Sequence, residues 1–213
     1  MNVIIDQIIK KDRRDLGCKP MADVLIMVDL QNDFLTGSLG ISNPEEIIDA
    51  NMKLLRKRID SASMERPLYI ILTQDTHDRD EYTLTLEGQM LPVGHCFVNE
   101  PGWQVDKEIQ DLALAFDSCP CIHITTVAKP SFGSLGLQKF LNNLADDYFL
   151  NIEFTGLDTD ICVVSNALIA RATLPNTPIT VYRGTTTGTT EENTEAAFSV
   201  MQSCQIVVKS MEE

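Results

Sequence analysis

The sequence predicts a single α/β domain with three layers, in which helices cover both faces of a six-stranded, mostly parallel sheet. Short apolar runs alternate with amphipathic stretches along most of the chain, a pattern typical of parallel strands joined by crossover helices. The first run, residues 24–28, is continuously apolar, as expected for a strand buried on both faces. A chain of 213 residues with 44% hydrophobic residues is long enough to bury one substantial core.

The expected elements follow in order along the chain. A helix is expected to begin at Pro44, because proline suits the first turn and Asn43 can act as the cap. Residues 75–120 form a long excursion after the second strand, and loops of this length in a compact domain are usually functional. Strands are expected at residues 24–28, 68–72, 122–127, 151–155, 179–182 and 206–208, and the other helices at residues 135–144, 162–172 and 190–201.

The domain is expected to span residues 21–213, with residues 1–20 as an N-terminal extension that is either helical or disordered. No basic region precedes a long apolar core, so a signal peptide is not expected. No apolar run approaches the roughly 20 residues needed to cross a bilayer. Six irregularly spaced cysteines without an export signal favour reduced thiols and a cytoplasmic protein.

The formal net charge of −14 disfavours nucleic acids and anionic membranes as partners, because both attract clusters of lysine and arginine. A small molecule is the expected partner. The acidic surface and the extension leave room for a homo-oligomer.

Three polar residues follow three different predicted strands. Asp29 follows the first, Lys129 the third and Cys162 the fourth, and ligands of such sheets bind at the carboxyl ends of the strands. The carboxylate can take the thiol proton, the ammonium group can stabilise the thiolate, and the thiolate can attack a carbonyl carbon. Each residue alone has a simpler explanation, as a turn residue, a surface lysine or a small buried side chain. Their convergence favours a catalytic triad.

Cys162 is expected where a helix begins, in the segment Gly156-Leu157-Asp158-Thr159-Asp160-Ile161-Cys162. The unpaired N–H groups and the positive dipole end of a helix lower the pKa of a thiol. The sequence therefore predicts a reactive thiol with a lowered pKa.

A second polar cluster comprises Asp75, His77 and His95, which lie in or next to the excursion. Two imidazoles and a carboxylate with open positions suit a divalent metal, with zinc as the first expectation and iron or manganese as alternatives. The third histidine, His123, lies within a predicted strand and is expected to be a packed strand residue.

Three blocks of the sequence, VDLQNDF, KPSFGSL and GLDTDICV, together resemble the isochorismatase-like cysteine hydrolases, and among them the nicotinamidase-related amidases. The resemblance covers about residues 22–208 and implies the same Rossmann-like fold with six mostly parallel strands. It implies that Asp29 is the proton acceptor, Lys129 its cationic partner and Cys162 the nucleophile.

The resemblance also implies the roles of further residues. Asp75, His77 and His95 match the metal ligands of the family, and Phe34 matches an aromatic residue that stacks on the substrate ring. A cis peptide is implied between Leu157 and Asp158, with the N–H groups of Asp158 and Cys162 forming the oxyanion hole. The implied reaction is hydrolysis of a small amide through a thioester, with nicotinamide as the first choice and NAD salvage as the context.

The sequence departs from the nicotinamidase pattern in two places. No tryptophan precedes the pair His95-Cys96, since the only one, Trp103, follows it. A fourth metal ligand is not evident, although Glu87 or Asp80 could supply a carboxylate. The alternatives are a hydrolase of an N-carbamoyl or ureide compound, an isochorismatase-type vinyl-ether hydrolase, and last a non-enzymatic binding protein. Cys162, together with Asp75, His77 and His95, disfavours the vinyl-ether hydrolase, because those enzymes do not need a cysteine nucleophile.

Overall fold

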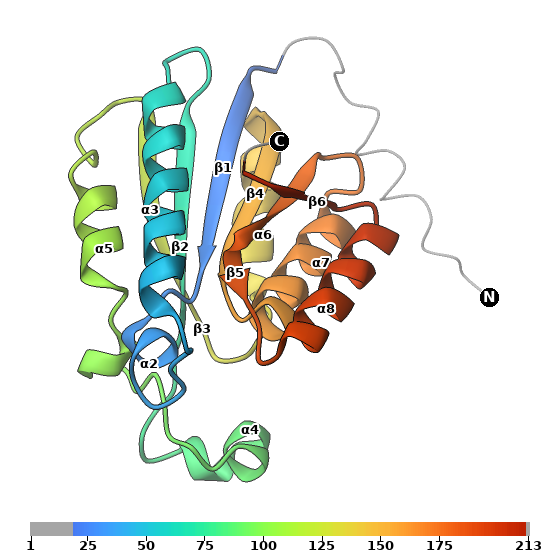
Figure 1. Ribbon diagram of the computed structural model, residues 1–213. Helices are drawn as coiled ribbons and strands as arrows, with labels where there is room; N and C mark the ends of the chain where they lie inside the picture. Colours follow the sequence, from blue (N-terminus) through green and yellow to red (C-terminus); the bar gives the residue numbers. More distant parts are fainter. Residues whose placement is uncertain (1–18, 212–213) are drawn as a thin grey trace.

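The computed structural model describes residues 19–211 and has three layers, with one sheet between two layers of helices (Figure 1). The sheet has six strands in the order β3-β2-β1-β4-β5-β6, and every neighbouring pair is parallel. The predicted fold class is therefore confirmed. The strands are β1 (Met21–Val28), β2 (Leu68–Asp75), β3 (Ile122–Lys129), β4 (Phe149–Leu157), β5 (Ile179–Thr187) and β6 (Val207–Ser210).

The helices divide between the two faces of the sheet (Figure 1). One face is covered by α3 (Pro44–Ser61) and α5 (Lys107–Leu114), and the other by α6 (Leu135–Asp147), α7 (Val164–Thr173) and α8 (Glu191–Ser203). The side chains of β1 alternate between the two cores, because successive residues of a strand point to opposite faces. Val24 and Ile26 lie in one core, and Leu25 and Met27 in the other.

The excursion after β2 contains short helices that the sequence analysis did not predict. They are α4 (Leu86–Met90), α5 and two single turns, η1 (Tyr82–Leu84) and η2 (Pro101–Trp103), and a further turn of helix, α2 (Asn32–Leu35), follows β1. Helices this short have too few residues to show the 3.6-residue period of apolar side chains that identifies a helix in the sequence. Side-chain caps were the available signal, since Asp106 accepts hydrogen bonds from the N–H groups that open α5.

Strand β3 lies at the edge of the sheet and pairs only with β2. His123 is consequently exposed, and its ring stacks on Tyr69 with the centroids 4.5 Å apart. His123 therefore lies within a strand, as expected, and packs against Tyr69, but its other face is open to solvent.

The helix expected at residues 162–172 begins earlier and in a different form. A π-helical turn, η3 (Thr159–Val163), follows β4 and continues directly into α7. Cys162 thus lies within the first helical turn rather than at its start. Most of the predicted extension, residues 1–18, lies outside the described residues, so its structure and the domain boundary stay predictions. Within residues 19–211, no helix is long and apolar enough to cross a membrane.

Candidate active site

The structure brings Asp29, Lys129 and Cys162 together at the carboxyl edge of the sheet. Lys129 is the last residue of β3, and its Nζ lies 2.7 Å from Oδ2 of Asp29 and 3.4 Å from Sγ of Cys162. The side chains of Asp29 and Lys129 are fully buried, and Cys162 is 5% exposed. Three residues from distant parts of the chain therefore form one buried group, as the sequence predicts.

Thr73, on β2, holds Asp29 in place. The Asp29 N–H donates to Oγ1 of Thr73 at 3.1 Å, and the Thr73 hydroxyl donates to Oδ1 of Asp29 at 2.6 Å. Asp29 has a φ of 48°, in the left-handed region that few residues other than glycine adopt. The two hydrogen bonds thus stabilise an unusual backbone conformation. Thr73 was not predicted as a site residue.

Replacing Thr73 with valine is expected to lower the free energy of unfolding by about 1–3 kcal/mol, because a buried N–H and a buried carboxylate oxygen lose their partner. Thr73→Ser keeps the hydroxyl and is expected to lose less than half as much. Urea unfolding of the three proteins measures the difference. A valine variant as stable as the parent would show that the hydrogen bonds do not hold Asp29.

Burial and the neighbouring charges shift the pKa of the Cys162 thiol in opposite directions. Burial raises the pKa of Cys162 well above its ordinary value, the charge of Asp29 raises it further, and Lys129 opposes both. Burial also raises the pKa of Asp29, against the opposing charge of Lys129. The lowered thiol pKa expected from the helix start is not supported, because burial and a neighbouring carboxylate outweigh the helix end. The thiol instead has a proton acceptor beside it.

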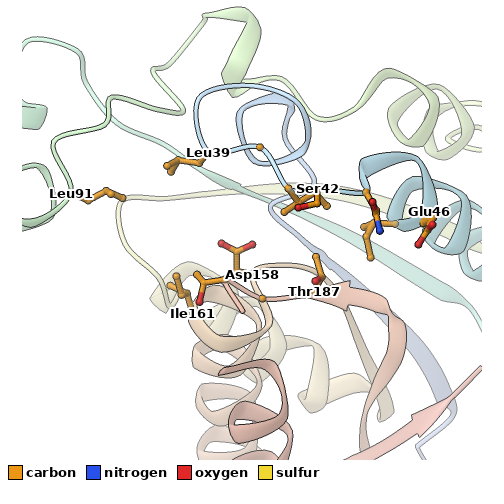
Figure 2. A pocket seen from close by; sticks show the side chains of 13 residues that line it. Leu39, Ser42, Glu46, Leu91, Asp158, Ile161 and Thr187 are labelled. Atoms are coloured by element: carbon orange, nitrogen blue, oxygen red, sulfur yellow. The ribbon is translucent and has the colours of Figure 1, made fainter. Parts of the chain in front are cut away.

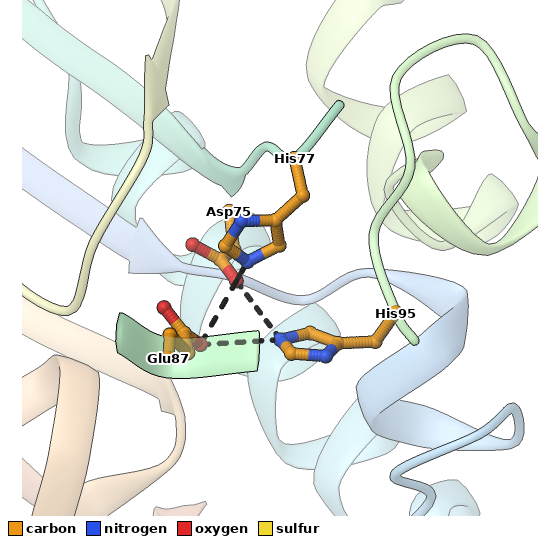
Figure 3. Close-up of side chains that lie close together, drawn as sticks. All are labelled: Asp75, His77, Glu87 and His95. Carbon is orange, nitrogen blue, oxygen red and sulfur yellow. Dashed lines mark hydrogen bonds and ion pairs between the residues drawn. The ribbon is translucent and has the colours of Figure 1, made fainter. Parts of the chain in front are cut away.

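The second predicted cluster also assembles, with one more member. Asp75, His77, Glu87 and His95 each offer one ligand atom, and these atoms all lie within 4.8 Å of one another (Figure 3). Nε2 of His77 lies 2.9 Å from Oδ2 of Asp75 and 3.7 Å from Oε1 of Glu87. Nε2 of His95 lies 3.3 Å and 3.5 Å from the same two oxygens. Glu87, from α4, is the missing fourth group, whereas Asp80 lies outside the cluster.

The four side chains fit a divalent metal. Bonds of about 2.0–2.1 Å in a tetrahedron place ligand atoms roughly 3.3 Å apart, close to the distances between the histidine nitrogens and the carboxylate oxygens. Burial lowers the pKa of His95, but hydrogen bonds to Asp75 and Glu87 outweigh it and raise the value to about 10. The cluster therefore favours positive charge.

Neighbouring groups orient two of these four residues. Nδ1 of His95 lies 2.9 Å from the Val93 carbonyl, which assigns the proton to Nδ1 and leaves Nε2 free to bind a metal. Gln31 accepts from the Asp75 N–H at 2.7 Å and donates to the Asp75 carbonyl at 2.9 Å. Gln31 lies in the VDLQNDF block, but the sequence analysis assigned it no role.

Asp75 contacts both Lys129 of the triad and the two histidines of the second cluster. Its Oδ1 lies 3.2 Å from Nζ of Lys129, while Oδ2 faces His77 and His95. Burial acts to raise the pKa of Asp75, but hydrogen bonds from the two histidines and the charge of Lys129 hold it below its ordinary value. An ionised carboxylate is therefore shared between the lysine and the histidines.

The remaining predicted residues lie around this centre. The peptide between Leu157 and Asp158 is cis, as the resemblance implies. Phe34 is buried beside His95, with the ring centroids 5.6 Å apart. Trp103 belongs to the scaffold, because its Nε1 donates to Oγ1 of Thr76 at 2.9 Å and its carbonyl accepts from Gln31 at 2.8 Å.

A parallel sheet with a carboxylate, a lysine and a cysteine at its carboxyl edge defines a hydrolase-like α/β domain with a cysteine centre. The isochorismatase domain model matches residues 23–213, and the chain therefore belongs to the isochorismatase family. The resemblance inferred from the three sequence blocks is confirmed. A comparison with curated proteins gives no match.

Solved structures share this fold. The nicotinamidase/pyrazinamidase from Bacillus subtilis superposes with a TM-score of 0.72 at 20% identity, covering 89% of this chain and 100% of the other. The pyrazinamidase from Pyrococcus horikoshii in complex with zinc has a TM-score of 0.65 at 22% identity, covering 89% and 99%. The N-carbamoylsarcosine amidase from Thermoplasma acidophilum has a TM-score of 0.67 at 20% identity, covering 91% and 98%.

Proposed function

We propose that the protein is a cysteine-dependent amidohydrolase that cleaves a small amide into a carboxylate and ammonia through a thioester. The observation that carries this proposal is the position of Lys129, whose Nζ contacts both the Asp29 carboxylate and the Cys162 sulfur inside a buried site. These are the groups that activation of a thiol requires.

The first half of the reaction forms the thioester. Asp29 accepts the thiol proton while Lys129 stabilises the developing thiolate, and Sγ of Cys162 attacks the amide carbon. The N–H groups of Asp158 and Cys162 donate to the oxyanion. Asp29 then passes its proton to the leaving nitrogen, the C–N bond breaks, and ammonia departs.

The second half releases the acid. Asp29, again ionised, takes a proton from a water molecule whose oxygen attacks the thioester carbon. The C–S bond breaks, the carboxylic acid leaves, and the proton returns to the sulfur of Cys162. The triad is thereby restored.

Asp75, His77, Glu87 and His95 would hold a divalent metal, with zinc as the first candidate and iron or manganese as alternatives. When bound, such an ion supplies a Lewis acid next to the reaction centre. The zinc complex of the Pyrococcus horikoshii pyrazinamidase supports the choice of zinc.

Nicotinamide is the first candidate substrate. Two observations support it, the likeness to nicotinamidase structures and the position of Phe34 beside His95, where its ring can stack on a substrate ring. Hydrolysis of nicotinamide would place the protein in NAD salvage.

An acyclic amide is the second candidate. Trp103 is tied to Thr76 and does not line the cavity described below, whose lining contains no aromatic side chain. The likeness to N-carbamoylsarcosine amidase supports an N-carbamoyl or related substrate equally well.

Ammonia release by the purified, metal-loaded protein tests the proposal, with nicotinamide, an N-carbamoyl amino acid and δ-aminovaleramide as substrates and Cys162→Ala as the blank. Cysteine-dependent release from any of the three supports the proposal and shows which class of amide is cleaved. No release above the blank from any of them would count against it.

Replacing His77 with alanine is expected to weaken metal binding by about 10-fold or more, because one of four ligands is lost. Elemental analysis of the purified variant and a competition titration with a chelator measure the loss. Asp80→Ala is the matched control, since Asp80 lies in the same excursion but outside the cluster. Equal metal content in both variants would remove His77 from the ligand set.

A further inference from the structure

A cavity of about 620 Å³ lies at the carboxyl ends of β4 and β5, and two of the residues that line it, Asp158 and Ile161, lie close to Cys162 in the sequence (Figure 2). Its volume lies within the usual range for small-molecule pockets. Much of its wall is aliphatic, from Leu39, Ile41, Ile47, Leu91 and Ile161, and polar side chains, among them Asp158 and Glu46, complete it. A ligand in it would contact methylene groups and hydrogen-bonding groups.

Asp158 connects this cavity to the reaction centre. Its backbone precedes η3, one helical turn before Cys162, and its side chain reaches into the cavity between Leu39, Leu91 and Thr187 (Figure 2). Ile161, which directly precedes Cys162 in the chain, also lines the cavity. A substrate whose amide carbon lies at Cys162 can therefore extend past Asp158 into the cavity.

The charged side chains that line the cavity are all acidic. Asp158 and Glu46 line it, and no lysine, arginine or histidine does. Within residues 19–211, the Asp158 carboxyl has neither a hydrogen-bond donor nor a cation as a partner. Glu46, in contrast, is exposed to solvent, so water screens its charge.

Burial raises the pKa of Asp158 to about 7, and the charges of Asp160 and Asp29 contribute in the same direction. An unpaired carboxylate in this position is costly to ionise. A bound cation would reduce that cost, whereas a bound anion would increase it.

We propose that Asp158 is a specificity-determining residue, and that among acyclic amides the preferred substrate is a small aliphatic amide whose far end carries an ammonium or similar cationic group. The inference rests on the proposed amidohydrolase function and specifies its substrate class. The aliphatic walls of the cavity accommodate the carbon chain of the substrate, and the Asp158 carboxylate pairs with its cationic group. Amides with a carboxylate at the far end are disfavoured.

Three straight-chain amides of similar length test this inference, δ-aminovaleramide (cationic), hexanamide (neutral) and glutaramate (anionic). At about pH 8, where the Asp158 carboxyl is ionised, kcat/KM is expected to be at least about 10-fold higher for the cationic amide than for the neutral one. Glutaramate is expected to be hydrolysed most slowly. In Asp158→Asn, the ratio of cationic to neutral amide is expected to fall to within about 3-fold of one.

Glu46→Gln is the matched control, because it removes the other carboxylate of the cavity lining. The cationic preference is expected to persist in this variant. The inference is overturned if the parent protein hydrolyses these amides without a cationic preference, if Asp158→Asn retains the preference, or if Glu46→Gln removes it.

Binding to the Cys162→Ala variant separates this inference from the proposed function. Calorimetry with the metal-loaded variant is expected to show tighter binding of δ-aminovaleramide than of hexanamide, and the added Asp158→Asn change is expected to remove the difference. If that result holds but the parent protein hydrolyses no amide, the cation site stands and the amidohydrolase proposal fails. If the parent protein hydrolyses the amides without regard to charge and the variant binds them equally, the amidohydrolase proposal stands and the cation site fails.

Discussion

Replacing Cys162 with alanine is expected to lower kcat/KM for amide hydrolysis by at least about 10⁴-fold, because no other group in the site can form the thioester. The fold is expected to survive, since the change removes a single sulfur atom from a core position. Ammonia release measures the first effect and circular dichroism the second.

The control is Cys204→Ala, which removes an exposed cysteine at the end of α8 and is expected to leave ammonia release unchanged. Residual activity above about 1% in Cys162→Ala, with trace parent enzyme excluded, would contradict the role of Cys162 as the nucleophile.

Replacing Asp29 with asparagine is expected to have opposite effects on turnover and on alkylation of the thiol. Turnover should fall by at least about 10³-fold, because the proton acceptor is lost. The resting thiol should nevertheless become reactive at lower pH. Asp29 raises the pKa of Cys162 and Lys129 lowers it, so removing the carboxylate leaves the lysine charge to favour the thiolate.

Iodoacetamide labelling across a pH series, resolved by peptide mass spectrometry, measures this shift. The exposed Cys204 is the internal reference, and its labelling is expected to be the same in both proteins. An unchanged or higher labelling pH for Cys162 in Asp29→Asn would mean that Asp29 does not control the thiol.

Much of the fold could be predicted because its determinants are local. Apolar runs such as residues 24–28 and the proline-started helix at Pro44 reflect backbone geometry that neighbouring residues impose. The order of these elements implies a parallel sheet, and such a sheet brings its carboxyl ends to one edge. That rule was sufficient to place Asp29, Lys129 and Cys162 together.

The short helices of the excursion, and with them Glu87, could not be predicted with the same certainty. Glu87 joins the cluster because the excursion brings α4 to the carboxyl end of β2, where Oε1 of Glu87 lies 3.5 Å from Nε2 of His95. Thr73 and Gln31 were missed for a related reason, since their importance lies in hydrogen bonds to residues far along the chain.

The sequence by itself determined the fold class, the family and the chemical types that meet at the site. The tertiary structure alone decided the direction in which the pKa of the Cys162 thiol is shifted, the sharing of Asp75 between Lys129 and the histidines, and the position of the Asp158 carboxyl without a partner. Burial and the distances between charges set these properties. Both are through-space quantities, and they arise only when segments distant in the sequence pack together.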